Sequence, residues 1–325
     1  MCKPFREAGL NARTVNIMAS SWRQSTKKQY VTYINKWKTF CCKKSISYLY
    51  SDVQCILEFF SDLYHDEGAG YSVINLARSA LSAFVILKDT TFSVGTHPFI
   101  QRFMKGVFHL RPPKPRYMET WDVNIVFNYL RTWSPANALD LKRLTLKLCM
   151  IIALISAQRI QSLHYLNLEG IILRDNAVTF HFKDLLKQSK PGNHSASMKL
   201  KAYPQDRRLC VVKYLREYIS RTHSIRAKEQ YLFISHKKPY RRVTTQTIAR
   251  WIKEVMEAAG IDTQIYKAHS TRAASTSAAD KSNFPVSHIL AQAGWTNERT
   301  FRKYYNKPCP SEKTYTEAII KSSLS

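Results

Sequence analysis

Acidic residues are scarce in this chain of 325 residues, in which 23 Asp and Glu stand against 50 Lys and Arg and give a formal net charge of +27. The scarcity is also local, because neither the segment between Glu7 and Asp52 nor the stretch from Thr90 to Met118 contains an acid. Basic faces without acids gain binding energy by displacing the counterions condensed on nucleic-acid phosphates. The charge distribution therefore predicts a polyanionic partner and favours a nucleic acid over an anionic membrane surface.

The chain also lacks paired cysteines and long apolar runs. Its seven cysteines form no Cys-x-x-Cys pair and no Cys/His cluster with zinc spacing, so we expect reduced, mostly buried thiols and no bound metal. The strongest apolar run, from Leu146 to Ala157, contains Lys147 and is too short to span a bilayer. The first twenty residues contain no apolar signal segment. These absences predict an intracellular protein with no membrane partner.

One boundary is visible in a chain without internal repeats. The segment from Leu110 to Tyr117 has three prolines in four positions, which prevents a helix and favours a stiff, extended, basic connector. We therefore expect an N-terminal extension (1–19), a helical DNA-binding domain (20–109), a Pro-rich linker (110–118) and a larger second domain (119–325).

Helical periodicity dominates the first domain. Thr26 with Gln29 resembles a capping box, and Ser51 with Gln54 resembles a second one. Further helices are expected from Ser72 and after Pro98. Trp22, Tyr30, Tyr33 and Trp37 are interpreted as helical core. The pattern predicts a small all-helical domain with basic outer faces.

The second domain mixes two periodicities. Short β-rich segments, separated by turn residues, lie between helical segments. The expected strands are 171–173, 177–182 and 198–200, and the expected helices are 121–130, 139–156, 206–221, 244–259, 269–280 and 286–293. We predict a mainly α chain with a small antiparallel β-sheet, arranged as a two-domain, C-shaped clamp around duplex DNA. The expected phosphate contacts outside the catalytic residues are Arg23, Lys27, Lys28, Lys36, Arg111, Lys114 and Arg116.

The C-terminal segment contains a compact set of chemically useful residues. It reads His269-Ser-Thr-Arg272, then Gly294-Trp295, then Thr300-Phe-Arg-Lys-Tyr304-Tyr305. His269 and Arg272 are three positions apart and would share one face of a helix, where both can point at one phosphate. Phosphodiester cleavage needs a nucleophile, cationic or hydrogen-bonding groups on the phosphate oxygens, and a proton donor for the leaving 5′ oxygen. No carboxylate cluster suited to two magnesium ions stands out, so we expect chemistry without metal or cofactor.

These motifs resemble the His-x-x-Arg, Gly-His/Trp and Tyr series of the tyrosine recombinases, which include phage and chromosome-dimer-resolving integrases. The wording His-Ser-Thr-Arg-Ala-Ala-Ser, Ala-Gly-Trp and Thr-Phe-Arg-Lys-Tyr-Tyr-Asn-Lys-Pro is most similar to the recombinases of DIRS-like and Ngaro-like eukaryotic retrotransposons. The resemblance implies a helical core-binding domain and a mixed α+β catalytic domain.

The resemblance also points to residues upstream. Ser156-Ala-Gln-Arg159-Ile-Gln-Ser-Leu163 is similar to the motif of the family's first catalytic Arg. The family's catalytic Lys lies in a β-turn between the motifs, where this chain offers Lys183, Lys187 and Lys190. Lys187 fits the retroelement wording best, and Lys190 is the alternative. Many relatives have an acid three residues after the first Arg, where this chain has Ser162, and this difference removes a carboxylate partner for Arg159.

The mechanism that the resemblance implies is a transesterification. A tyrosine attacks the phosphorus and becomes linked to the 3′ phosphate, His269 acts as base, and Lys187 protonates the leaving 5′ oxygen. Arg159, Arg272, His269 and Trp295 hold or surround the pentacovalent phosphate. The bond energy is conserved in the phosphotyrosyl ester, so a partner strand can reverse the step.

Two adjacent tyrosines compete for the role of nucleophile. Spacing in many integrases, nine residues after the Gly-His/Trp residue, selects Tyr304, whereas the retroelement pattern selects Tyr305. Adjacent helical residues point about 100° apart, so only one can face the phosphate. We favour Tyr305.

The resemblance predicts a DNA recombinase or integrase of a transposable element, acting as a homotetramer on synapsed double-stranded DNA in the nucleus. Two alternatives stay open. The chain could be a catalytically inactive, domesticated DNA-binding protein of the same fold, or a type IB topoisomerase-like nicking and closing enzyme. Formation of a covalent protein–DNA adduct discriminates between the enzymes and the binding protein.

Overall fold

The computed structural model describes residues 2–187, 189 and 197–309, and it divides into two compact units, the first ending at Pro115 and the second beginning at Arg116. This division lies within the segment 110–118 that the sequence predicts as a connector. Each unit has its own hydrophobic core.

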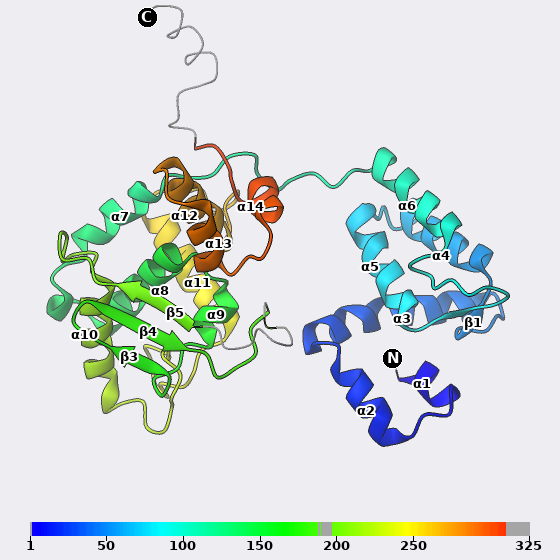
Figure 1. Cartoon of the computed structure of the whole chain (residues 1–325), viewed down its shortest axis with the longest axis horizontal. Coiled ribbons are helices and arrows are strands. Elements are labelled where there is room, and N and C mark those ends of the chain that lie inside the picture. The colour runs from blue at the N-terminus through cyan, green and yellow to red at the C-terminus, as the bar shows by residue number, and fades with distance from the viewer. Residues whose placement is uncertain (1, 188, 190–196, 310–325) are drawn as a thin grey trace, which may run out of the picture. The chain divides into compact units, whose positions relative to one another are not determined.

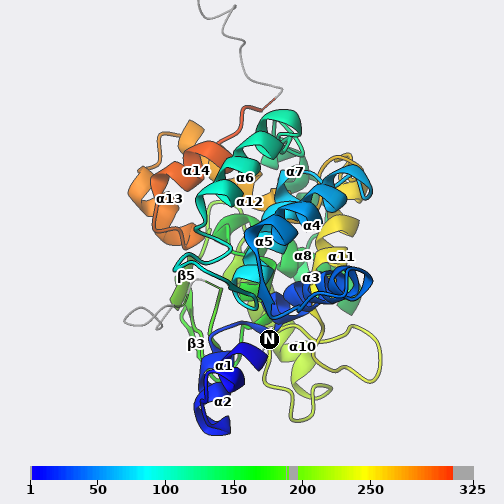
Figure 2. The same ribbon diagram turned by 90° about the vertical axis from the view of Figure 1, so that its right-hand side faces the viewer.

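The first unit is built from helices that pack around Trp37, Phe60, Ile74 and Leu81, all of which are fully buried. Figures 1 and 2 show α4, α5 and α6 next to one another beside α3. Its helices are α1 (Lys3–Glu7), α2 (Ala12–Ser20), α3 (Gln24–Lys43), α4 (Val53–His65), α5 (Tyr71–Ser82) and α6 (Pro98–Leu110). The segment predicted as an N-terminal extension thus contains two short helices.

Three local predictions for this unit are wrong. Helix α3 begins at Gln24, so Thr26 lies inside it and caps nothing, and α4 has Asp52 rather than Ser51 at its N-cap, without a side-chain cap. The unit is also not entirely helical, because β1 (Tyr50–Ser51) pairs in parallel with β2 (Ile86–Leu87). Two-residue strands of this kind have no alternation long enough to be read from sequence.

The second unit combines helices with one small sheet. Strands β3 (Ile171–Leu173), β4 (Ala177–His181) and β5 (Ser197–Lys201) form an antiparallel sheet in that order, with Val178 opposite Leu200. Figure 1 shows this sheet beside α8 and α10. The helices are α7 (Val123–Thr132), α8 (Leu141–Ser156), α9 (Ile160–His164), α10 (Val211–His223), α11 (Thr245–Ala258), α12 (Ser270–Lys281), α13 (Val286–Ala293) and α14 (Glu298–Tyr304). The prediction of a mainly α chain with a small antiparallel sheet is confirmed.

Helix α8 is the central element of the second unit. Asp140 caps its first turn by accepting from the Arg143 N–H, and nearly every side chain from Leu144 to Leu154 is buried because α10, α11 and α12 pack around the helix. An apolar run longer than about ten residues is typical of a helix that is buried on all sides. Its interior Lys147 donates to two backbone carbonyls and to the Tyr214 hydroxyl.

Of the seven cysteines, three are buried, three are partly buried, and Cys42 on α3 is exposed. The expectation of mostly buried thiols is therefore wrong, because fewer than half of them are fully buried. Within the described ranges, no helix has the length and hydropathy to cross a membrane. The same ranges hold no cluster of three His, Cys, Asp or Glu side chains arranged to bind a metal ion.

Candidate active site

Helix α12 presents the first two predicted site residues. His269 is its N-cap, Arg272 lies in its first turn, and the spacing of three places both on one side of the helix. The start of the helix is fixed by the Trp121 indole, whose N–H donates to the Ser270 hydroxyl at 2.9 Å. The spacing of three orients the two side chains together, and the Trp121 contact holds the first turn of the helix that carries them.

Arg272 is a buried cation with unused donors. Its side chain is 1% exposed, and one guanidinium N–H donates to the Ala293 carbonyl at 3.0 Å. Nε and Nη1 are buried and have no hydrogen-bond partner in the described part of the chain. Burial and the charge of Arg159 lower the pKa of Arg272 to about 10, so the guanidinium stays protonated near neutral pH. Buried donors without partners are costly, and they are a feature of sites that bind an anion.

Trp295 adds another unused donor next to Arg272. Helix α13 ends at Gly294, whose φ of 68° is favourable for glycine, and this turn directs Trp295 inward. The indole is buried, and its Nε1 has no partner among the described residues. The Arg272 guanidinium lies over the indole, 4.8 Å from its centroid. Three buried N–H groups are thus gathered in one place.

Tyr305, and not Tyr304, joins this group. The Tyr305 ring lies 4.4 Å from the Trp295 ring, between centroids, and its hydroxyl is 3.2 Å from His269 Nε2. Tyr304 is 57% exposed, and its described ring contact is with Lys303. Tyr304 is the last residue of α14 and Tyr305 is its C-cap, and adjacent residues of a helix point about 100° apart.

His269 is held in its neutral form. Desolvation by the surrounding atoms, followed by the charges of Arg272, Arg159, Lys187 and Arg116, lowers the pKa of His269 to about 4. A neutral imidazole with an unprotonated Nε2 accepts the hydrogen bond from the Tyr305 hydroxyl. This arrangement suits a general base for the phenol.

Arg159 reaches the same place from another part of the chain. It is the N-cap of α9, just after Ala157 ends α8 in the left-handed conformation with φ of 50°. Its charge contributes to the lowered pKa of both His269 and Arg272, so the Arg159 guanidinium acts electrostatically on both groups.

The loop that carries Arg159 is braced by amide side chains. Gln158 donates through Nε2 to the Gln292 carbonyl at 2.5 Å and accepts from the Ser162 hydroxyl at 3.0 Å. Gln292 in turn donates to the Ile155 carbonyl. Ser162 thus has a hydrogen-bonding role at the position where relatives have a carboxylate, and it acts on the loop through Gln158.

Lys187 lies in the turn after β4, where Leu186 and Ser189 hydrogen-bond to each other. The Lys187 side chain is exposed, and its charge is among the causes of the lowered pKa of His269. Lys183 forms an ion pair with Glu169. The alternative Lys190 lies outside the described residues.

The predicted phosphate contacts of the first unit are in varied environments. Arg23 and Lys28 are exposed on or beside α3, Lys27 is half-buried there, and Lys36 forms an ion pair with Glu67. The Arg111 guanidinium donates to the Tyr64 carbonyl at 2.7 Å and stacks on the Tyr64 ring, and its contact with phosphate stays a prediction. Lys114 is exposed.

Two residues at the start of the second unit adjoin the site. Arg116 is exposed, and its charge acts on His269. Tyr117, which sequence reasoning missed, is half-buried against Tyr266, and burial together with the Tyr305 phenol raises its pKa. No local signal distinguishes Tyr117 from an ordinary connector residue.

Comparison with protein families confirms the class. Residues 127–309, more than half of the chain, match the phage integrase family, and the chain belongs to that family. Comparison with curated proteins finds no match.

Solved structures of tyrosine recombinases share the fold. XerH recombinase bound to palindromic difH in a post-cleavage complex has a TM-score of 0.57 at 13% identity, over 85% of this chain and 72% of that one. A lambda integrase dimer bound to a COC′ core site has a TM-score of 0.52 at 15% identity, over 93% and 77% of the two chains. The Tn1549 transposon integrase in complex with transposon right end DNA has a TM-score of 0.51 at 13% identity, over 84% and 85%. The chain is therefore a phage integrase family member with the fold of the tyrosine recombinases.

Proposed function

We propose that this protein cleaves and rejoins DNA strands through a covalent 3′-phosphotyrosyl intermediate formed by Tyr305. The observation that carries the proposal is the position of the phenol, 3.2 Å from Nε2 of a neutral His269 and beside three buried donors without partners. A phosphate placed there would receive hydrogen bonds from Arg272 and Trp295 and the charge of Arg159. Donors of this kind stabilise charge that develops in a transition state.

The proposed step conserves the number of phosphoester bonds. The Tyr305 oxygen attacks the phosphorus and its proton passes to His269, while the bond from phosphorus to the 5′ oxygen breaks. Lys187 supplies a proton to that leaving oxygen. Attack by the 5′ hydroxyl of a partner strand on the phosphotyrosyl ester reverses the step and releases Tyr305.

The substrate that we propose is double-stranded DNA, because the net charge of +27 favours a phosphate backbone. The motif wording favours a recombinase of a DIRS-like or Ngaro-like mobile element, acting in the nucleus. A homotetramer on two synapsed duplexes would bring four such sites together for strand exchange. The XerH, lambda and Tn1549 proteins are bound to DNA in these structures, which supports DNA as the substrate class.

The test is covalent capture of DNA. We expect incubation with supercoiled plasmid and with a pool of nicked duplexes of randomised sequence, in EDTA, to yield an adduct that resists denaturant and is destroyed by protease. The adduct should disappear in Tyr305→Phe and persist in Tyr304→Phe, which is the matched control. The reverse pattern would assign the attack to Tyr304.

Two other outcomes would replace the proposal. DNA binding without adduct formation by the wild type would favour the inactive, DNA-binding alternative. Adduct formation with relaxation of supercoils, but without joined strands from two duplexes, would favour the topoisomerase-like alternative.

A further inference from the structure

The tyrosine segment receives little support from its own helix. Helix α14 has seven residues, from Glu298 to Tyr304, and Phe301 is its one buried side chain. Tyr305 follows as the C-cap, and the N–H groups of Tyr305 and Asn306 both donate hydrogen bonds to the Phe301 carbonyl. A helix this short is marginal by itself. The position of the phenol must therefore be set by contacts outside α14.

A buried serine of α12 supplies two of these contacts. The Ser277 hydroxyl donates to the Tyr305 carbonyl at 2.8 Å and accepts from the Lys307 N–H at 2.9 Å. Ser277 is 7% exposed, so these bonds are shielded from water. The Ser277 hydroxyl therefore acts as both donor and acceptor, and its two hydrogen bonds hold the backbone at Tyr305 and at Lys307.

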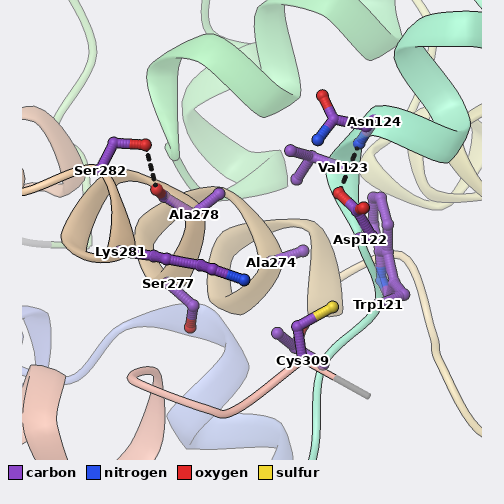
Figure 3. Close-up of a pocket in the computed structure, with 11 residues that line it drawn as sticks. Trp121, Asp122, Val123, Asn124, Ala274, Ser277, Ala278, Lys281, Ser282 and Cys309 are labelled. Carbon is purple, nitrogen blue, oxygen red and sulfur yellow. Dashed lines mark hydrogen bonds between the residues drawn. The ribbon is translucent and has the colours of Figure 1, made fainter. Parts of the chain in front are cut away.

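Asp280, one turn further along α12, holds the same segment from a second point. Its carboxylate accepts two N–H bonds from Arg302, the shorter at 2.9 Å, and one from the Asn306 amide at 3.0 Å. Beyond them, the Thr120 N–H donates to the Pro308 carbonyl at 2.8 Å. Figure 3 shows Ser277 on α12, where the chain leading to Cys309 passes.

Helix α12 therefore carries the proposed phosphate-binding groups and also holds the segment that contains Tyr305. The N-terminal turn of α12 carries His269 and Arg272, and its C-terminal half carries Ser277 and Asp280. The spacing of eight between His269 and Ser277, and between Arg272 and Asp280, is about 2.2 turns, so the four side chains fall within a sector of about 140° around the helix axis. A rigid helix thus sets the distance between the phosphate-binding groups and the nucleophile.

We propose that Ser277 is a positioning residue that holds Tyr305 in line with the phosphate, supported by Asp280. This inference rests on the proposed function. A displacement of about 1 Å between reacting groups can cost about 10²-fold in rate, and a flexible C-cap without the serine permits such displacement.

Ser277→Ala tests the inference without removing a group that touches DNA. Alanine is a good helix former of similar size, so α12 should fold normally. We expect the rate of adduct formation in a single turnover to fall between about 10-fold and 10²-fold, following the cost of misplaced reacting groups. DNA affinity should stay unchanged, and Ser277→Thr should recover most of the rate because it keeps the hydroxyl. Ser282→Ala is the matched control, since Ser282 lies at the end of the same helix and its hydroxyl donates to Ala278, away from the tyrosine segment.

Amide hydrogen exchange tests the contact independently of catalysis. The amide of Lys307 should be protected in the wild type and should exchange at least about 10-fold faster in Ser277→Ala, because its acceptor has gone. Loss of protection with an unchanged rate of adduct formation would overturn the positioning role. Equal loss of DNA affinity and rate, without recovery in Ser277→Thr, would also overturn it. If the wild type forms no adduct, the proposed function fails, and the exchange rates alone decide whether Ser277 holds the segment.

Discussion

Replacing Arg272 with methionine should stabilise the protein while abolishing cleavage. The guanidinium is 1% exposed, makes one hydrogen bond to the Ala293 carbonyl, and leaves Nε and Nη1 without partners in the described structure. Arg159 adds an unfavourable like charge, which contributes to the lowered pKa of Arg272. Methionine has a similar volume, an unbranched flexible side chain, no charge and no N–H donor, so it removes these costs without leaving a large cavity.

The magnitude follows from the gains and losses at this one position. Relief of two unsatisfied donors is worth about 1–3 kcal/mol each, whereas the lost bond to Ala293 costs about 1 kcal/mol. The lost cation–π contacts with Trp295 and Tyr305 cost about 0.5–2 kcal/mol. At the middle of these ranges a gain of about 4 kcal/mol exceeds a loss of about 2 kcal/mol, so we expect a net stabilisation of about 1–2 kcal/mol, within the range seen when apolar residues replace buried ions. For a unit of about 200 residues this corresponds to a rise in Tm of about 2–8 °C.

Calorimetry and adduct formation measure the two sides of this prediction. Cleavage should fall by at least about 10²-fold to 10³-fold, as expected when a donor to a transition-state oxygen is removed. Arg216→Met, at an exposed arginine paired with Asp175, is the control and should leave both quantities unchanged. A lower Tm for Arg272→Met, or retained cleavage, would refute the reasoning that this cation is kept for phosphate binding at the expense of stability.

Two further predictions concern titration. Because the pKa of His269 is lowered to about 4, the imidazole is neutral across pH 6–8, so titration of His269 should not change the rate of adduct formation in that range, and the rate should fall as the pH approaches 4. A rate that halves near pH 6.5 in a pH series, with that step lost in His269→Gln, would contradict this. Burial lowers the pKa of Lys147 to about 7, below its ordinary value of 10.5. Between these pH values the unfolded chain binds more protons than the folded protein, so the free energy of unfolding should rise with pH from about 7 to 10. In Lys147→Met this slope should vanish, and at pH 7 the loss of the donor to two carbonyls and the Tyr214 hydroxyl should destabilise the protein by about 3 kcal/mol. Urea unfolding at several pH values measures both effects, and a variant with the wild-type slope would show that another group titrates.

Sequence patterns predicted some elements of the second unit with their bounds. The segments 286–293 and 171–173 match α13 and β3 at both ends, and the buried run of α8 was visible as an apolar stretch. Short elements were missed, including α9, β1 and α14. For α14 a signal was present, since Asn297 caps the helix and Glu298 follows in its first turn.

The structure also shows what Ser162 contacts at the position where many relatives have an acid. Ser162 replaces an acid, and its hydroxyl meets Gln158, which reaches Gln292 in α13. The two glutamines are 134 positions apart, so no local pattern relates them. Such a brace depends on how α8, α9 and α13 pack.

By itself, the sequence determined the residue types of the site and the placement of His269 and Arg272 on one face of one helix, because a spacing of three has the same geometry in every α-helix. Tertiary structure decided the rest. It brought the charges of Arg159 and Lys187 to act on His269, and it placed Tyr305 rather than Tyr304 against His269 and Trp295. Ser277 and Asp280 of α12 form hydrogen bonds with the backbone of Tyr305 and with Asn306, and contacts between segments this distant in sequence arise only when the helices pack.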